Sequence, residues 1–123
     1  MAVLAASVFL GLSVVSAQAQ DYPNKPIRLI VPFPPGGVDT VARIVAQELT
    51  NTMGQTVVVD NRAGASGTIG TALAVNARTD GYTVLFANIS LAINVSLFPK
   101  LPYDTLKDLT PVSLIGRQAN LLV

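Results

Sequence analysis

Two glycine-rich loops carry the residues whose types and spacing could do chemistry. The first loop contains Gly36 and Gly37, and the second runs from Gly64 to Gly67. Each loop leads into a helix-like segment, and the start of a helix presents unpaired backbone N–H groups and a partial positive charge. Because glycine has no Cβ, a ligand can approach its backbone closely. The loops predict an anion site made of backbone amides, with tight turns that bind no ligand as the alternative.

Polar side chains beside these loops allow two interpretations each. Asp39 caps its own helix or pairs with a ligand ammonium group, and capping is favoured. Arg62 binds a ligand carboxylate or forms a surface ion pair with Asp60, and the ion pair is favoured. Ser66 and Ser90 donate to a ligand or cap the helices that follow them. For these two serines the sequence favours neither alternative.

The composition excludes several kinds of site. The chain has no histidine and no cysteine, which removes disulfides, imidazole or thiolate metal ligands and nucleophile–histidine triads. Eight basic and seven acidic residues nearly cancel, and no clustered basic face indicates nucleic-acid binding. The glycine spacing of the second loop differs from the dinucleotide fingerprint, and no P-loop motif occurs. The acidic residues are scattered, with no pair placed for acid–base catalysis.

The hydrophobic pattern alternates between strand-like and helix-like segments. Short β-branched runs fit strands that are buried on both faces. The alternation is typical of a mainly parallel α/β sheet with helices on both faces. In such a sheet the loops that follow the strands share one edge, where ligands bind. Strands are predicted at 27–33, 56–60, 82–87, 112–115 and 120–123, and helices at 39–53, 68–77 and 88–96.

The helical segments also predict which side chains face the sheet. Apolar residues three or four positions apart share one side of a helix. Gly54 follows the first helix at the position where a C-terminal glycine is expected. The predicted inward positions are Val41, Ile44, Val45 and Leu49 in the first helix, and Ile69, Ala72 and Leu73 in the second.

Residues 1–19 have the features of a secretory signal peptide. No charge occurs before Asp21, residues 2–15 are apolar, and Ala17-Gln18-Ala19 matches the A-x-A cleavage pattern. The apolar stretch is too short for a flanked transmembrane helix. No lysine or arginine precedes it, so we expect the natural start to lie upstream of Met1. The sequence also ends inside an apolar run, so we expect the mature part, residues 20–123, to be truncated.

Short motifs in a fixed order run through nearly all of residues 20–123. In chain order they are YPNKPIRLIVPF at 22–33, PGG at 35–37 with Asp39 and Ala42-Arg43, VVVDNR at 57–62 with Gly64-Ala65, Gly67 and Ile69-Gly70, DGYT at 80–83, AIN at 92–94, LPYD at 101–104 and LTPV at 109–112. Together these motifs resemble the substrate receptors of tripartite tricarboxylate transporters, the Bug family. Only Val38 separates Gly37 from Asp39, where the family usually has two residues.

The resemblance implies a periplasmic-binding-protein type II-like lobe with a mainly parallel sheet flanked by helices, truncated here. Residues 20–123 would form the N-terminal part of lobe 1 of a two-lobed solute receptor. Such receptors are periplasmic, bind a small carboxylate and deliver it to the membrane permease subunits of the transporter. The resemblance implies a monomer in full-length form, with no enzymatic activity, cofactor or nucleic acid.

The resemblance also implies which residues contact the ligand. In the family, backbone amides and bridging waters hold the carboxylate. Carried over by position, the contacts are Gly36, Gly37, Val38, Asp39, Gly64, Ala65, Ser66 and Gly67, with Ser90 as a weaker candidate.

Two alternatives to a working receptor stay open. The chain is a truncated copy without function, or it is a fragment of an α/β enzyme whose catalytic half is missing.

Overall fold

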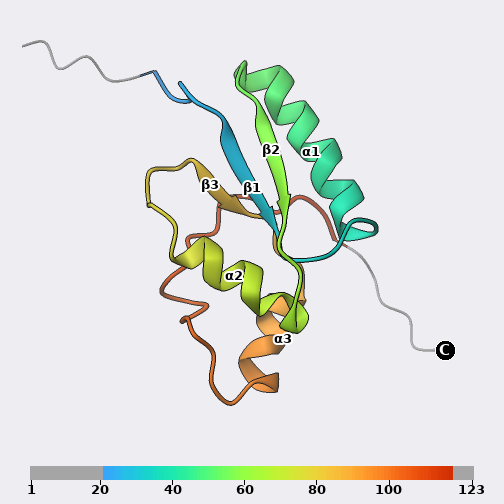
Figure 1. The fold of residues 1–123 in the computed structure, drawn as a ribbon, viewed down its shortest axis with the longest axis vertical. Coiled ribbons are helices and arrows are strands. Elements are labelled where there is room, and N and C mark those ends of the chain that lie inside the picture. The colour runs from blue at the N-terminus through green and yellow to red at the C-terminus, as the bar shows by residue number, and fades with distance from the viewer. Residues whose placement is uncertain (1–20, 118–123) are drawn as a thin grey trace, which may run out of the picture.

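A three-stranded parallel sheet forms the centre of the computed structural model, which describes residues 21–117. The strands follow the order β2-β1-β3, so β1 lies in the middle (Figure 1). In this register Leu29 lies between Val59 of β2 and Val84 of β3. The parallel sheet confirms the predicted α/β class. The strand bounds are β1 Ile27–Val31, β2 Val57–Asn61 and β3 Thr83–Leu85.

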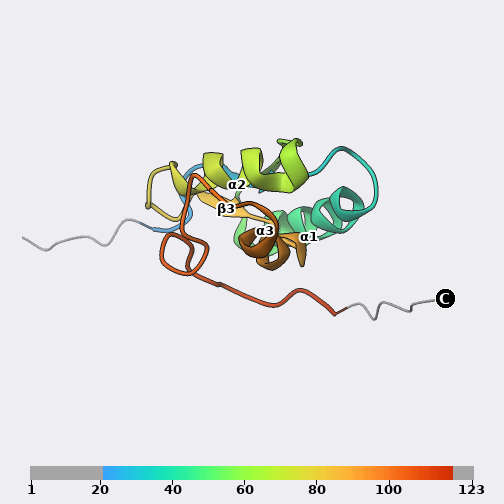
Figure 2. The same cartoon turned by 90° about the horizontal axis from the view of Figure 1, so that it is seen from below.

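Helices cover both faces of the sheet, as the sequence predicts. Helix α1 (Val38–Met53) packs on β1 and β2, whereas α2 (Thr68–Val75) packs on β1 and β3 from the opposite face (Figure 2). A short 3-10 turn, η1 (Ala65–Gly67), precedes α2, and α3 (Ser90–Leu97) packs against that turn. Among the helices of residues 21–117, none has the length and hydrophobicity needed to cross a membrane.

Among the described residues the central strand supplies four of the eight buried hydrophobic side chains, because strands flank both of its edges and helices cover both of its faces. Ile27, Leu29, Ile30 and Val31 are all buried, which confirms a strand covered on both faces. The strand ends at Val31, two residues before the predicted end at Phe33. Pro32 follows, and proline has no N–H with which to extend the ladder.

The predicted inward face of α1 is wrong. Val41 and Ile44 are 46% and 66% exposed, whereas Asp39, Ala42 and Ala46 are buried against the sheet. Apolar residues form two neighbouring stripes along this helix, one with Val41 and Ile44 and one with Ala42 and Ala46, and only the second packs on the sheet. The stripe with small alanines lies inward, where short side chains allow the helix to approach the strands closely. A ranking by hydrophobicity alone selects the bulkier stripe.

The predicted inward face of α2 is wrong for a related reason. Ile69 and Leu73 are exposed, and the buried positions are Thr68, Gly70 and Thr71. A Cβ added to Gly70 would lie 2.7 Å from the Arg62 carbonyl oxygen and 2.9 Å from the Cα of Pro32. Small residues therefore face inward because the helix lies almost directly on the chain that leaves β1 and β2.

The predicted strand at 112–115 is also wrong. In the described part of the chain these residues form no strand, and Val112 and Leu114 are highly exposed. An apolar β-branched run becomes a strand only where a neighbouring strand supplies hydrogen-bond partners. Residues 112–115 make no such pairing, so the apolar β-branched pattern alone does not suffice to predict a strand. The strand predicted at 120–123 lies outside the described residues.

Candidate ligand-binding loops

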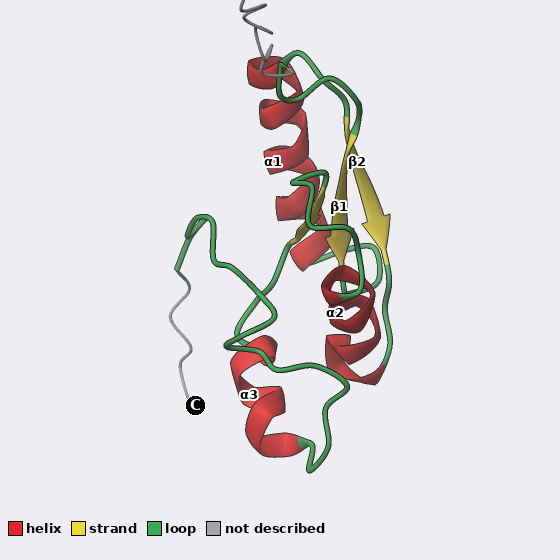
Figure 3. Cartoon of the chain, turned by 90° about the vertical axis from the view of Figure 1, so that its left-hand side faces the viewer, coloured by secondary structure: helices red, strands yellow, loops and turns green. Residues whose placement is uncertain are grey.

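Three loops follow the carboxyl ends of the parallel strands and therefore lie at the same end of the sheet (Figure 3). They are residues 32–37 after β1, 62–64 with η1 after β2, and 86–89 after β3. A small recess joins all three loops. It is lined by Pro32, Phe33, Ser66, Gly67, Thr71, Ala87, Asn88, Ser90, Leu91 and Asn94.

The first loop turns through two left-handed glycines directly before α1. Gly36 has φ of 110° and Gly37 has φ of 44°, and the Asp39 N–H closes the turn on the Gly36 carbonyl oxygen at 2.9 Å. Within residues 21–117, the N–H groups of Gly36, Gly37 and Val38 donate to no acceptor. The loop thus presents three unpaired amides at a helix N-terminus, where an anion is favoured.

The second loop holds four consecutive residues at positive φ. The values are 135° at Gly64, 45° at Ala65, 54° at Ser66 and 89° at Gly67. A non-glycine residue in this region costs about 1–3 kcal/mol, and such strain persists only where the surroundings impose it, often at ligand sites. The N–H groups of Ala65 and Ser66 donate to no acceptor in the described part of the chain. This loop offers a second pair of unpaired amides.

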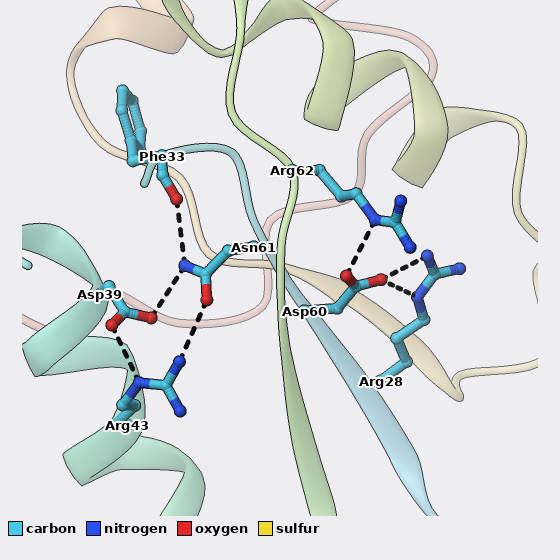
Figure 4. Close-up of polar contacts among 7 residues, drawn as sticks. All are labelled: Arg28, Phe33, Asp39, Arg43, Asp60, Asn61 and Arg62. Atoms are coloured by element: carbon cyan, nitrogen blue, oxygen red, sulfur yellow. Dashed lines mark hydrogen bonds and ion pairs between the residues drawn. The ribbon is translucent and has the colours of Figure 1, made fainter. Parts of the chain in front are cut away.

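Asp39 does not cap α1, which corrects the favoured interpretation of that residue. The N-cap position is Gly37, and Asp39 lies inside the first turn with only 3% exposure. Its Oδ2 accepts from Arg43 Nε at 2.9 Å and its Oδ1 from Asn61 Nδ2 at 2.8 Å (Figure 4). Hydrogen bonds from Arg43 and Asn61 together with the Arg43 charge lower the pKa of Asp39, outweighing the opposing effect of burial.

Arg62 forms the surface ion pair that the sequence favours. Its Nε donates to Asp60 Oδ1 at 2.8 Å, and Arg28 Nε donates to Asp60 Oδ2 at 2.7 Å (Figure 4). Burial raises the pKa of Asp60, but the hydrogen bonds and charges of Arg28 and Arg62 outweigh it and leave the pKa below its ordinary value. Arg62 therefore already has a carboxylate partner in the chain.

Neither serine caps a helix. The N-cap of α2 is Gly67 and that of α3 is Ile89, and neither of these N-cap residues makes a side-chain capping bond. The Ser90 N–H instead donates to Asn88 Oδ1 at 2.9 Å. Both residues line the recess between the loops, and their contact with a ligand stays a prediction.

The structure brings the predicted contact residues to one end of the sheet. Ser66, Gly67 and Ser90 line the recess, and Gly64 and Ala65 precede them in the second loop. Residues 36–39 lie outside the lining, at the end of the first loop and the start of α1.

Two asparagines in the same region stand in family motifs, but the sequence predicts no role for them. Asn61 ends β2, and Asn94 is almost fully buried in α3. A single amide inside the apolar segment of α3 was the available signal for Asn94, because buried amides need partners.

The parallel α/β unit matches part of the fold of solved periplasmic binding proteins. The model of the tripartite tricarboxylate transporter family receptor matches residues 41–123, and the chain belongs to this family.

Relatives and solved structures agree with this assignment. The chain is 47% identical to Protein BugT of Bordetella pertussis over 114 residues, covering 89% of this chain and 35% of that protein. A structure titled as a periplasmic transporter shares 47% identity at a TM-score of 0.68, covering 70% of this chain and 30% of the other. MatC from Rhodopseudomonas palustris with bound malate shares 36% identity at a TM-score of 0.70, covering 76% and 33%. The chain thus spans about a third of the length of these relatives.

Proposed function

We propose that this chain is part of a periplasmic receptor that binds a small carboxylate and delivers it to the permease of a tripartite tricarboxylate transporter. In this proposal the chain supplies unpaired backbone N–H groups that bind the carboxylate. The observation that carries the proposal is the pair of loops with unpaired backbone N–H groups at one end of the sheet. Carboxylate oxygens only accept hydrogen bonds, and backbone N–H groups at a helix start are suitable donors. The malate in the MatC structure supports the ligand class.

The proposed contacts are the nine residues predicted from the sequence. Within residues 36–39 and 64–67 the unpaired N–H groups supply the backbone donors, whereas the N–H groups of Asp39 and Gly67 close their own turns. Ser90, which lines the recess, supplies a hydroxyl. The glycines allow the carboxylate to approach the main chain without meeting a side chain. Asp39 contributes its place in the first turn of α1 rather than its carboxylate, because Arg43 and Asn61 already occupy both carboxylate oxygens.

The proposal assigns a receptor role rather than catalysis. The carboxylates that adjoin the two loops in sequence, Asp39 and Asp60, are both paired with arginine side chains. Hydrogen bonding to arginine lowers the pKa of each, which is unsuitable for a general acid or base near neutral pH. We propose that the chain binds its ligand and releases it unchanged.

In the proposed organisation, residues 1–19 are a signal peptide that directs export to the periplasm. Residues 20–123 form the N-terminal part of lobe 1, and a second lobe completes the site in the manner of longer family members. The receptor acts as a monomer without a cofactor, and its partners are the carboxylate and the membrane permease subunits.

A chimera with MatC tests the proposal. Residues 21–117 of this chain replace the matching third of MatC, and malate binding is measured by calorimetry with intact MatC as the control. We expect saturable one-site binding, with malate recovered unchanged after incubation. A chimera that folds, as judged by circular dichroism, but does not bind malate would contradict the carboxylate role.

A further inference from the structure

The geometry points to Asn61 and Asn94 as positioning residues that hold the two glycine loops in the conformation that exposes their amides, an inference that rests on the proposed function. Neither residue is among the proposed ligand contacts. Each lies on an element outside the loop that it holds, Asn61 at the end of β2 and Asn94 in α3. Each donates its side-chain N–H to a carbonyl oxygen of the main chain.

Asn61 connects the two ends of the first loop. Its Nδ2 donates to the Phe33 carbonyl oxygen at 3.0 Å, where the loop begins, and to Asp39 Oδ1 at 2.8 Å, where α1 has started (Figure 4). Its Oδ1 accepts from Arg43 at 3.1 Å. One side chain therefore fixes the distance between the entry and the exit of the loop that holds Gly36 and Gly37.

Asn94 holds the second loop at Ser66, one of its two non-glycine residues with positive φ. Its Nδ2 donates to the Ser66 carbonyl oxygen at 2.9 Å, although the two residues are 28 positions apart. Ser66 has φ of 54°, and Asn94 is only 2% exposed. The other side-chain bonds to this loop come from Thr68 and Thr71 of the adjoining α2. Within residues 21–117, Asn94 is the one side chain from a separate element that donates to residues 64–67.

The two asparagines act in the same chemical way. Each satisfies carbonyl oxygens of its loop, so the loop does not need to turn its own N–H groups inward to pair them. Those N–H groups stay available for an acceptor from outside. A neutral amide can hold a carbonyl without adding a charge that would compete for a carboxylate ligand. The strain at Ser66 persists only if the surroundings maintain it, and Asn94 supplies that restraint.

Leucine variants of this chain test the inference, because leucine has nearly the shape of asparagine and no hydrogen-bonding group. Backbone ¹⁵N relaxation is measured on the full chain and on its Asn61→Leu and Asn94→Leu variants. We expect order parameters in the affected loop to fall from about 0.85 to below about 0.6. Asn61→Leu should affect residues 34–38 only, and Asn94→Leu should affect residues 64–67 only. Asn51→Leu is the control, since Asn51 is exposed and bonds only to Gln47.

Measuring both loops in each variant separates a positioning role from a general loss of stability. Unchanged order parameters in both loops, or an equal decrease in the loops and in β1, would overturn the inference. If a leucine variant fails to fold, the serine variants Asn61→Ser and Asn94→Ser replace it, since serine is too short to reach the same carbonyls. The measurement needs no ligand. If each variant loosens only its own loop but the malate chimera does not bind malate, the proposed function is refuted and the positioning role is retained.

Discussion

At the scale of single residues, Asp39 shows how a side chain beside a binding loop can be structural. Its carboxylate is buried and accepts from Arg43 and Asn61, which ties the first turn of α1 to the end of β2. Sequence alone identified Asp39 as important but assigned it to capping, because aspartate before a helix is a common cap. The partner Asn61 lies 22 positions away, and no local pattern could reveal that contact.

Arg43→Met should raise the pKa of Asp39. The hydrogen bond from Arg43 is the largest cause of the lowered pKa, so its removal should move the pKa toward the ordinary value of 3.8. A lowered folded-state pKa means that ionised Asp39 stabilises the fold above the ordinary pKa, and that this contribution is lost as pH falls through the folded value. The variant should therefore lose it at a higher pH than the parent.

Carboxyl ¹³C NMR titration and urea unfolding between about pH 2 and pH 5 measure both effects. Arg78→Met, at an exposed position, is the control and should leave the Asp39 titration unchanged. The same Asp39 pKa in the parent and in Arg43→Met would show that the ion pair is not what holds the carboxylate ionised.

At the scale of elements, the order and type of most segments could be predicted because hydrophobic period and β-branched runs determine them locally. The side of each helix that packs against the sheet could not be predicted in this way. Both α1 and α2 turn small residues inward, and closeness to the backbone rather than hydrophobicity decides the face. The strand predicted at 112–115 failed because pairing depends on residues elsewhere in space. The two loops were found as glycine clusters, but the strain at Ala65 and Ser66 was not visible in the sequence.

Gly70→Ala should destabilise the contact between α2 and the chain leaving β1. The new Cβ would lie 2.7 Å from the Arg62 carbonyl oxygen and 2.8 Å from Pro32 Cβ. Overpacking of this kind costs about 1–3 kcal/mol, against about 1 kcal/mol gained in helix propensity. The difference is a net loss of up to about 2 kcal/mol, and we expect the upper part of this range because backbone atoms limit the relaxation.

Urea unfolding of Gly70→Ala measures this loss. Gly116→Ala is the matched control, because a Cβ at Gly116 would meet nothing within 4 Å and its φ is not in the left-handed region. A Gly70→Ala variant as stable as the Gly116→Ala control would mean that α2 can move away from β1 at little cost.

At the scale of the whole molecule, the described residues form one α/β unit that corresponds to about a third of its relatives. The family and fold class could be predicted from motif order, since the motifs follow one another in a fixed order along nearly all of residues 20–123. The chain spans about a third of the length of its relatives, so the sequence of residues 20–123 carries no information on contacts made by the other two thirds of those proteins.

Export should remove residues 1–19 from the chain. Ala17-Gln18-Ala19 follows an uncharged apolar stretch, and signal peptidase cleaves after such small residues. Mass spectrometry of the protein recovered from a bacterial periplasm should give an N-terminus at Gln20 or Asp21. Recovery with Met1 retained would contradict the cleaved signal peptide.

The central claim is that backbone amides, rather than a side-chain charge, bind the carboxylate. Gly37 has φ of 44°, which a β-branched residue avoids, so Gly37→Val should displace the amides of the first loop. A lost charge-assisted hydrogen bond costs about 1.5–3 kcal/mol, which lowers affinity at least about tenfold. Arg62 pairs with Asp60 at the surface, so Arg62→Ala should cost about 1 kcal/mol or less.

Calorimetric titration of malate into the MatC chimera, carrying either Gly37→Val or Arg62→Ala, tests this claim most directly. We expect the Gly37→Val dissociation constant to rise at least about tenfold and the Arg62→Ala value to change by about fivefold or less. Loss of malate binding in Arg62→Ala together with near-parental affinity in Gly37→Val would contradict the account and indicate a site built on an arginine side chain.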